Sequence, residues 1–124
     1  MCGCSHTYTE QDFADSKWSD SSGTIIEFYK NGNCNVRNIK WDSIYPSSWT
    51  TDSLWEEKHP NTFVGHWTIK SNRYNEQEIY FQIEDSGYGF SFGIENIDLI
   101  ERTIGDPDDC VYYQLIRAKD HNRI

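Results

Sequence analysis

Basic residues are scarce in this sequence. It holds 11 Lys and Arg against 20 Asp and Glu in 124 residues, which gives a formal net charge of −9. Proteins that bind nucleic acid through its phosphates concentrate Lys and Arg on one face, so this balance argues against a nucleic-acid binder. The length fits a single domain.

Long apolar runs and signatures of catalysis are also missing. No apolar run approaches the roughly 18 residues that a membrane helix needs. The chain has no nucleophile-elbow serine, no His-Glu-x-x-His and no phosphate-binding glycine loop. The carboxylate pairs Glu56–Glu57 and Glu76/Glu78 form no readable glycosidase pattern. We therefore expect a protein that is not an enzyme and uses no cofactor.

Metal-binding spacings are absent too. None of the four cysteines stands in a Cys-x-x-Cys pair or near a histidine at zinc-finger spacing, which disfavours a structural zinc site. The acidic cluster at residues 106–109 lacks the ligand spacing of a calcium loop, so we expect a solvated turn there. Cys34 and Cys110 lie in predicted strands, and two alternatives stand for them: a disulfide, or two separate buried thiols.

Aromatic residues, in contrast, are abundant. Phe, Trp and Tyr make up 15% of the chain, which excludes a disordered acidic protein. The clearest strand signal is Thr24–Lys30, followed by Asn31-Gly32 and a return strand from Cys34 to Trp41. Asn-Gly between two such runs predicts a β-hairpin. The apolar phase changes within the return strand, which predicts a bulge or a bend near Asn38.

Further alternating runs predict strands separated by short turns, at Phe63–Ser71, Glu78–Glu84, Tyr88–Glu95, Ile97–Ile104 and Cys110–Ala118. About seven to eight antiparallel strands in a meander favour an all-β fold, a barrel or a sandwich. Large side chains are expected to point inward and to favour a filled core over a ligand cavity: Phe28, Trp41, Trp67, Phe81, Phe90 and Phe92.

The segment from Ser43 to Thr62 is the least regular part of the body. A loop of this length in a small domain is often functional. Its aromatic residues Tyr45, Trp49 and Trp55 are the candidates for contact with a ligand or partner. The alternative is that they cap an open end of the barrel.

Three motifs in order resemble the lipocalin-like domains of small bacterial lipoproteins. They are Ser16-Lys17-Trp18, the hairpin from Ile26 to Cys34, and the run from Val64 to Ile69 with its Gly-x-Trp-x-Ile pattern. The resemblance implies an antiparallel meander barrel with a binding or structural role. It divides the chain into an N-terminal tether (1–17), a lipocalin-like barrel (18–118) and a polar tail (119–124).

The first residues, Met1-Cys2-Gly3-Cys4, resemble the end of a bacterial lipobox. That resemblance implies that Cys4 is a lipid anchor and that the polar residues after it form a tether. The alternatives are an ordinary cytosolic N-terminus and a Cys-x-Cys soft-metal site. Within this stretch, Thr9 to Ala14 is expected to form one short helical turn, because Asp12 stands three residues after Thr9.

Two functional hypotheses result. The first is a non-enzymatic lipocalin-like domain of a bacterial envelope lipoprotein, tethered through Cys4, with a binding or structural role toward a small apolar ligand or another partner. The second is an acidic cytoplasmic protein of the immunity or inhibitor type that binds a basic protein partner, because a charge of −9 accelerates association with a basic surface.

Overall fold

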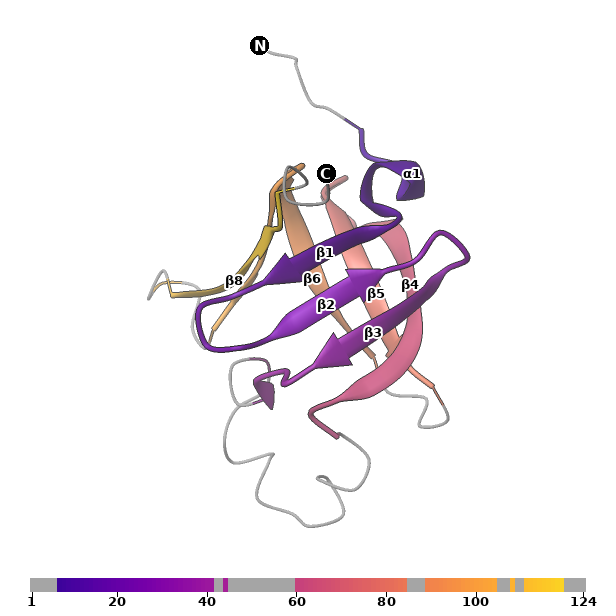
Figure 1. Cartoon of the computed structure of the whole chain (residues 1–124). Coiled ribbons are helices and arrows are strands. Elements are labelled where there is room, and N and C mark those ends of the chain that lie inside the picture. Colours follow the sequence, from indigo (N-terminus) through magenta and orange to yellow (C-terminus); the bar gives the residue numbers. More distant parts are fainter. Residues whose placement is uncertain are drawn as a thin grey trace.

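The computed structural model describes residues 7–41, 44, 60–84, 89–104, 108 and 111–119. In this part of the chain, one short helix precedes eight strands that pair in sequence order and close into a barrel (Figure 1). The elements are α1 (Glu10–Phe13), β1 (Ser16–Ser19), β2 (Ile25–Phe28), β3 (Asn33–Arg37), β4 (Phe63–Ser71), β5 (Gln77–Ile83), β6 (Gly89–Asn96), β7 (Leu99–Thr103) and β8 (Tyr112–Arg117).

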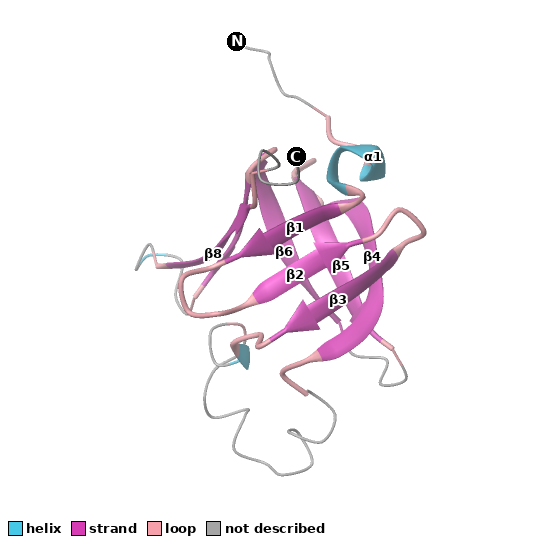
Figure 2. Ribbon diagram, viewed as in Figure 1, coloured by secondary structure: helices cyan, strands magenta, loops and turns pink. Residues whose placement is uncertain are grey.

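The prediction of an all-β, lipocalin-like antiparallel meander barrel is confirmed. All eight strand pairs are antiparallel, including the β1–β8 pair that closes the barrel. Figure 2 shows how little of the described chain is helical. Among the described residues, no helix is both long enough and apolar enough to cross a membrane.

The β2–β3 hairpin forms where Asn31-Gly32 predicted it. Gly32 has φ +91°, a conformation that glycine adopts without steric cost. The turn closes through a hydrogen bond from Tyr29 N to Asn33 O, 2.9 Å long. The register then places Phe28 opposite Cys34 and Ile26 opposite Val36, and all four side chains are fully buried.

Of the bulge and the bend predicted near Asn38, the structure shows the bend. β3 ends at Arg37, and Asn38 takes a left-handed conformation with φ +57°. That turn brings Ile39 and Trp41 back into the core, where both are buried. The irregularity in strand pairing lies instead between β6 and β7, at Ile94–Asn96.

Aromatic side chains pack the interior of the barrel. Ring contacts run from Trp18 to Phe28, from Phe28 to Phe81 and from Phe81 to Phe90, with centroids 6.2, 5.5 and 4.9 Å apart. The six side chains predicted to point inward are all buried: Phe28, Trp41, Trp67, Phe81, Phe90 and Phe92. The barrel is therefore filled by its own side chains over this region, as a small barrel allows.

The described part of the predicted tether belongs to the fold, which corrects the boundary at residue 17. Ser16 already pairs with Phe28 in β1, and Trp18 pairs with both Ile26 and Arg117. Phe13 is fully buried and stacks on Trp18 with centroids 5.7 Å apart. In a solvated tether these rings would be exposed to water. Residues 7–17 therefore pack against the barrel and form part of the folded domain.

The short helix α1 forms as predicted and lies at one end of the barrel (Figure 1). Asp12 Oδ2 accepts a hydrogen bond of 2.9 Å from Thr9 N, which caps the first turn. Gln77 of β5 exchanges two hydrogen bonds with the backbone of Tyr8, and Arg117 of β8 donates one to Asp12 O. Contacts with strands on different sides of the rim hold α1 in place.

Candidate functional site

The residues predicted to contact a ligand or partner lie outside the described part of the chain. This holds for Tyr45, Trp49 and Trp55, and also for the predicted lipid anchor Cys4. Of the cysteines, Cys34 is described: it is a free, fully buried thiol, and burial raises its pKa to about 12. Cys110 lies outside the described residues. Of the two alternatives for Cys34, a disulfide with Cys110 or a separate buried thiol, the structure shows the buried thiol.

The charges on the described strands are unevenly distributed around the barrel. On β1 to β4 the outward-facing charged residues are Lys17, Glu27, Arg37 and Lys70, with a surplus of cations. On β5, β6 and β7 the outward-facing charged residues are Glu78, Glu95 and Glu101. Among the described strands, the outward-facing carboxylates are therefore most numerous on β5 to β7, with Lys70 of β4 opposite Glu78 at their border.

An open groove of about 550 Å³ crosses this acidic side. Strand pairing places Glu78, Gly93 and Glu101 in one row across β5, β6 and β7, so the two carboxylates flank a glycine. Because Gly93 has no side chain, the surface is low between them. We call this hollow the acidic groove; its described lining is Tyr8, Asn72, Asn75, Glu76, Gln77, Glu78, Gly93, Ile94, Glu95, Glu101, Thr103 and Tyr112.

Neighbouring amides hold the carboxylates of the acidic groove. Asn72 Nδ2 donates to Glu76 Oε1 and to Glu78 Oε2, at 3.2 and 3.3 Å. Gln114 Nε2 donates to Glu101 Oε1 at 2.8 Å. Amide donors are uncharged, so they orient these glutamates without neutralising them. None of the described lining residues is Lys or Arg.

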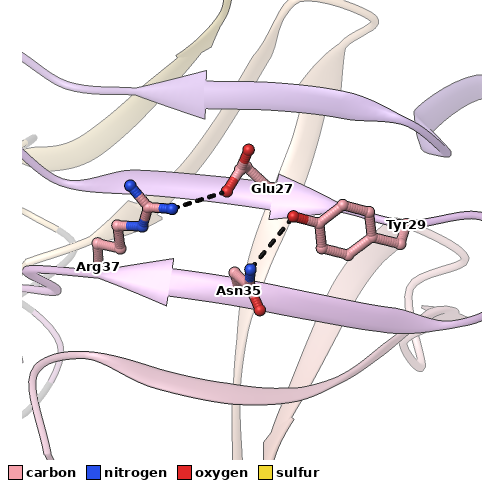
Figure 3. Close-up of polar contacts among 4 residues, drawn as sticks. All are labelled: Glu27, Tyr29, Asn35 and Arg37. Atoms are coloured by element: carbon pink, nitrogen blue, oxygen red, sulfur yellow. Dashed lines mark hydrogen bonds and ion pairs between the residues drawn. The ribbon is translucent and has the colours of Figure 1, made fainter.

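The opposite side of the barrel shows a different arrangement. There Glu27 forms an ion pair with Arg37, with 3.6 Å between Glu27 Oε1 and Arg37 Nη2 (Figure 3). Beside this pair, Asn35 Nδ2 donates a hydrogen bond of 3.2 Å to the Tyr29 hydroxyl. Within the described part of the chain, an ion pair within 4.0 Å is thus found on the β2–β3 face and not in the acidic groove, where the register places Lys70 opposite Glu78.

The acidic groove was missed by sequence reasoning. Alternation indicates that Glu78 and Tyr80 share a face of β5, but it says nothing about which residues of β6 and β7 lie beside them. Only the register reveals that a glycine separates two glutamates. The pair Glu76/Glu78, noted above for its spacing, does come together in the groove through Asn72.

Comparison of the chain with protein-family models, with curated proteins and with solved structures found no match. The resemblance to the lipocalin-like domains of bacterial lipoproteins therefore stays a prediction, beyond the barrel architecture itself. Among the described residues, no three or more His, Cys, Asp or Glu side chains are grouped so as to hold a metal ion.

Proposed function

We propose that this protein is a non-enzymatic binding domain that uses the outside of its barrel, and that its partner is a basic segment of another protein. The observation that carries the proposal is the acidic groove, where four glutamates line one hollow: Glu76, Glu78, Glu95 and Glu101. A Lys- or Arg-rich segment is the protein chemistry that complements such a surface.

The packed interior supports a binding surface on the outside. Rings of Phe28, Phe81 and Phe90 contact one another inside the barrel, and each is at most 4% exposed. A small ligand that entered this region would have to displace aromatic side chains from a close-packed core, which is costly. The small apolar ligand considered from sequence is therefore the less favoured partner.

The fixed carboxylates support recognition rather than mere solubility. Hydrogen bonds from Asn72 and Gln114 restrict Glu76, Glu78 and Glu101 before a partner arrives. A surface that is ordered in advance loses less conformational entropy on binding. Electrostatic attraction between the groove and a basic segment would speed association and would weaken steeply with salt.

The first test compares two double variants of equal charge with a lysine-rich peptide as the probe. Glu78→Gln with Glu101→Gln removes two charges from the groove, and the amide oxygens can still accept from Asn72 and Gln114. Because each exposed ion pair contributes about 0.2–1 kcal/mol, we expect the peptide to bind roughly twofold to thirtyfold more weakly in calorimetry.

The matched control is Asp15→Asn with Glu27→Gln, which removes the same charge from elsewhere on the surface. We expect it to change peptide affinity much less than the groove variant does. Gly93→Val offers a steric check, because a Cβ on Gly93 lies 3.5 Å from Glu101 O, an ordinary contact, yet would fill the groove. Equal weakening in both charge variants, with full affinity in Gly93→Val, would refute the groove as the binding surface.

The location of the protein and its anchor stay predictions. Cys4 lies outside the described residues, and both the cell envelope and the cytoplasm are compatible with a domain that binds through its outer face. Intact mass spectrometry of the protein from its native cells tests the anchor, since diacylation at Cys4 adds a large, defined mass.

A further inference from the structure

The barrel closes through a short contact between its first and last strands. β1 and β8 share two register pairs, Trp18 with Arg117 and Ser19 with Ile116. β8 continues past this contact toward Tyr112 while paired with β7. On the other side of the gap, the chain leaves β1 at Ser19 and turns through Asp20–Gly23 into β2. A hollow of about 370 Å³ lies here; we call it the seam pocket.

One wall of the seam pocket is polar, and hydrogen bonds to Asp20 stabilise it. Asp20 Oδ1 accepts hydrogen bonds from Ser22 N, Ser22 Oγ and Thr24 N, at 2.8, 2.9 and 3.0 Å. All three of these hydrogen bonds use Oδ1, and the hydroxyls of Thr24 and Tyr113 also interact with the Asp20 carboxylate. Partial burial acts to raise the pKa of Asp20, but these hydrogen bonds outweigh it and the pKa lies below its usual value.

A buried hydroxyl pair stands behind this wall. Thr24 is fully buried and Tyr113 is 6% exposed, and their hydroxyl oxygens lie 2.7 Å apart. Thr24 Oγ1 also lies 2.8 Å from Asn38 O, and the Tyr113 hydroxyl accepts from Lys40 N at 3.3 Å. These bonds tie β2, β8 and the segment after β3 together, so the pocket has a rigid base.

The remaining lining is largely apolar or aromatic. Ile104 and Ile116 lie in the lining together with Tyr112. Ile116 is 56% exposed, a high fraction for a large apolar side chain. Lys40 is the cation of the lining, and among the described residues no ion pair joins it to Asp20. Asp20 and Lys40 thus place one charge of each sign in the lining of the pocket.

We propose that the seam pocket is a second binding site, which adjoins the acidic groove at Tyr112, for a small protonated amine that carries an apolar or aromatic group. Asp20 would accept hydrogen bonds from the ammonium group, and the apolar group would lie against Ile104 and Ile116. The volume of about 370 Å³ falls in the range of small-molecule sites, roughly 300–1,000 Å³. The site does not depend on the proposed partner of the groove.

Benzylamine is a suitable probe, with benzyl alcohol as its uncharged counterpart. In amide chemical-shift titrations of the full chain, we expect benzylamine to shift Ser22, Thr24 and Gln114, and benzyl alcohol to bind more weakly. Asp20→Asn keeps an oxygen for the three hydrogen bonds of the turn but loses the charge. Since a hydrogen bond to a charged group is strong, we expect roughly tenfold weaker benzylamine binding in this variant.

Two further variants make the outcome decisive. Lys40→Gln keeps the backbone N–H that binds Tyr113, and removal of its positive charge should tighten benzylamine binding. Glu27→Gln, on β2 and outside both hollows, should leave it unchanged. The proposal is overturned if benzylamine shifts appear around the groove instead, or if Asp20→Asn binds benzylamine as well as the unaltered protein does. Loss of the folded amide spectrum would identify a variant that fails to fold. Ile116→Ser, at an exposed position and without a change of charge, then tests the apolar wall and should weaken the binding of benzylamine and benzyl alcohol alike.

Discussion

Phe13 is fully buried although its neighbours in the sequence are polar. Its ring lies between Tyr8 and Trp18, with centroids 5.8 and 5.7 Å away. Trp18 in turn donates from Nε1 to Ser16 Oγ at 2.8 Å, which satisfies its polar atom in the core. One aromatic residue thus joins the N-terminal turn to the barrel.

We predict that Phe13→Ala lowers the free energy of unfolding by about 3–5 kcal/mol, because it removes a buried ring and leaves a cavity. Urea denaturation followed by tryptophan fluorescence measures this change. Tyr74→Ala is the control, since Tyr74 is 69% exposed and its loss should cost about 0.5 kcal/mol or less. A cost for Phe13→Ala no larger than for Tyr74→Ala would show that the N-terminal turn contributes nothing to the fold.

Alternation predicted most of the strands but not the first one. β4 has the predicted bounds, Phe63–Ser71, because burial that alternates from Phe63 to Trp67 gives a clear periodic signal. β1 has four residues and one large apolar side chain, Trp18, so its pattern is too short to be distinguished from a loop. β1 forms because β2 and β8 pair with it on its two sides. The pairing with β8 depends on the tertiary structure, so the local sequence pattern does not reveal it.

α1 and β4 interact through a single carboxylate. Glu10 Oε2 accepts from Ile69 N at 3.1 Å and from Thr68 Oγ1 at 3.3 Å, at a position of β4 beyond its register with β3. The hydrogen bond from Ile69 is the main reason why the pKa of Glu10 lies below its usual value. The short helix therefore covers part of a strand edge that would otherwise face solvent.

This contact predicts a pH dependence. Because the pKa of Glu10 is lower in the folded protein, the charged carboxylate stabilises the fold above the usual glutamate pKa of about 4.3, and this contribution is lost as the pH falls through the lowered value. Glu10→Gln should thus be less stable than the unaltered protein at neutral pH and approach it in acid. Thermal unfolding at a series of pH values measures the difference. A gap that stays constant down to strongly acidic pH would contradict the role of Glu10.

The positions of the charged residues on the barrel surface could not be predicted from the sequence. The net charge of −9 argues against a nucleic-acid partner, but it gave no indication that Glu78, Glu95 and Glu101 lie on the adjacent strands β5 to β7. That asymmetry arises only when the barrel closes and each strand takes its register. The same applies to the seam pocket, whose lining comes from four separate stretches of the chain.

Cys34 reports on the integrity of the closed barrel. Its thiol is fully buried and its pKa is raised to about 12, so it has little thiolate and no access to reagents in the folded state. In a variant with Cys2, Cys4 and Cys110 changed to Ser, we predict that Ellman's reagent labels Cys34 only after denaturation. Fast labelling of the native protein at mildly alkaline pH would show that the barrel opens readily around β3.

The pairing of β1 with β8 joins residues that are almost a full chain length apart, since Ser19 lies opposite Ile116. During synthesis, β1 must therefore wait for nearly the whole chain to leave the ribosome before it finds its second neighbour. Until then, the aromatic inner face formed by β2 to β7 lacks its final strand and is exposed to aggregation. The emergence of β8, rather than of the early hairpin, is thus the event that permits the barrel to close.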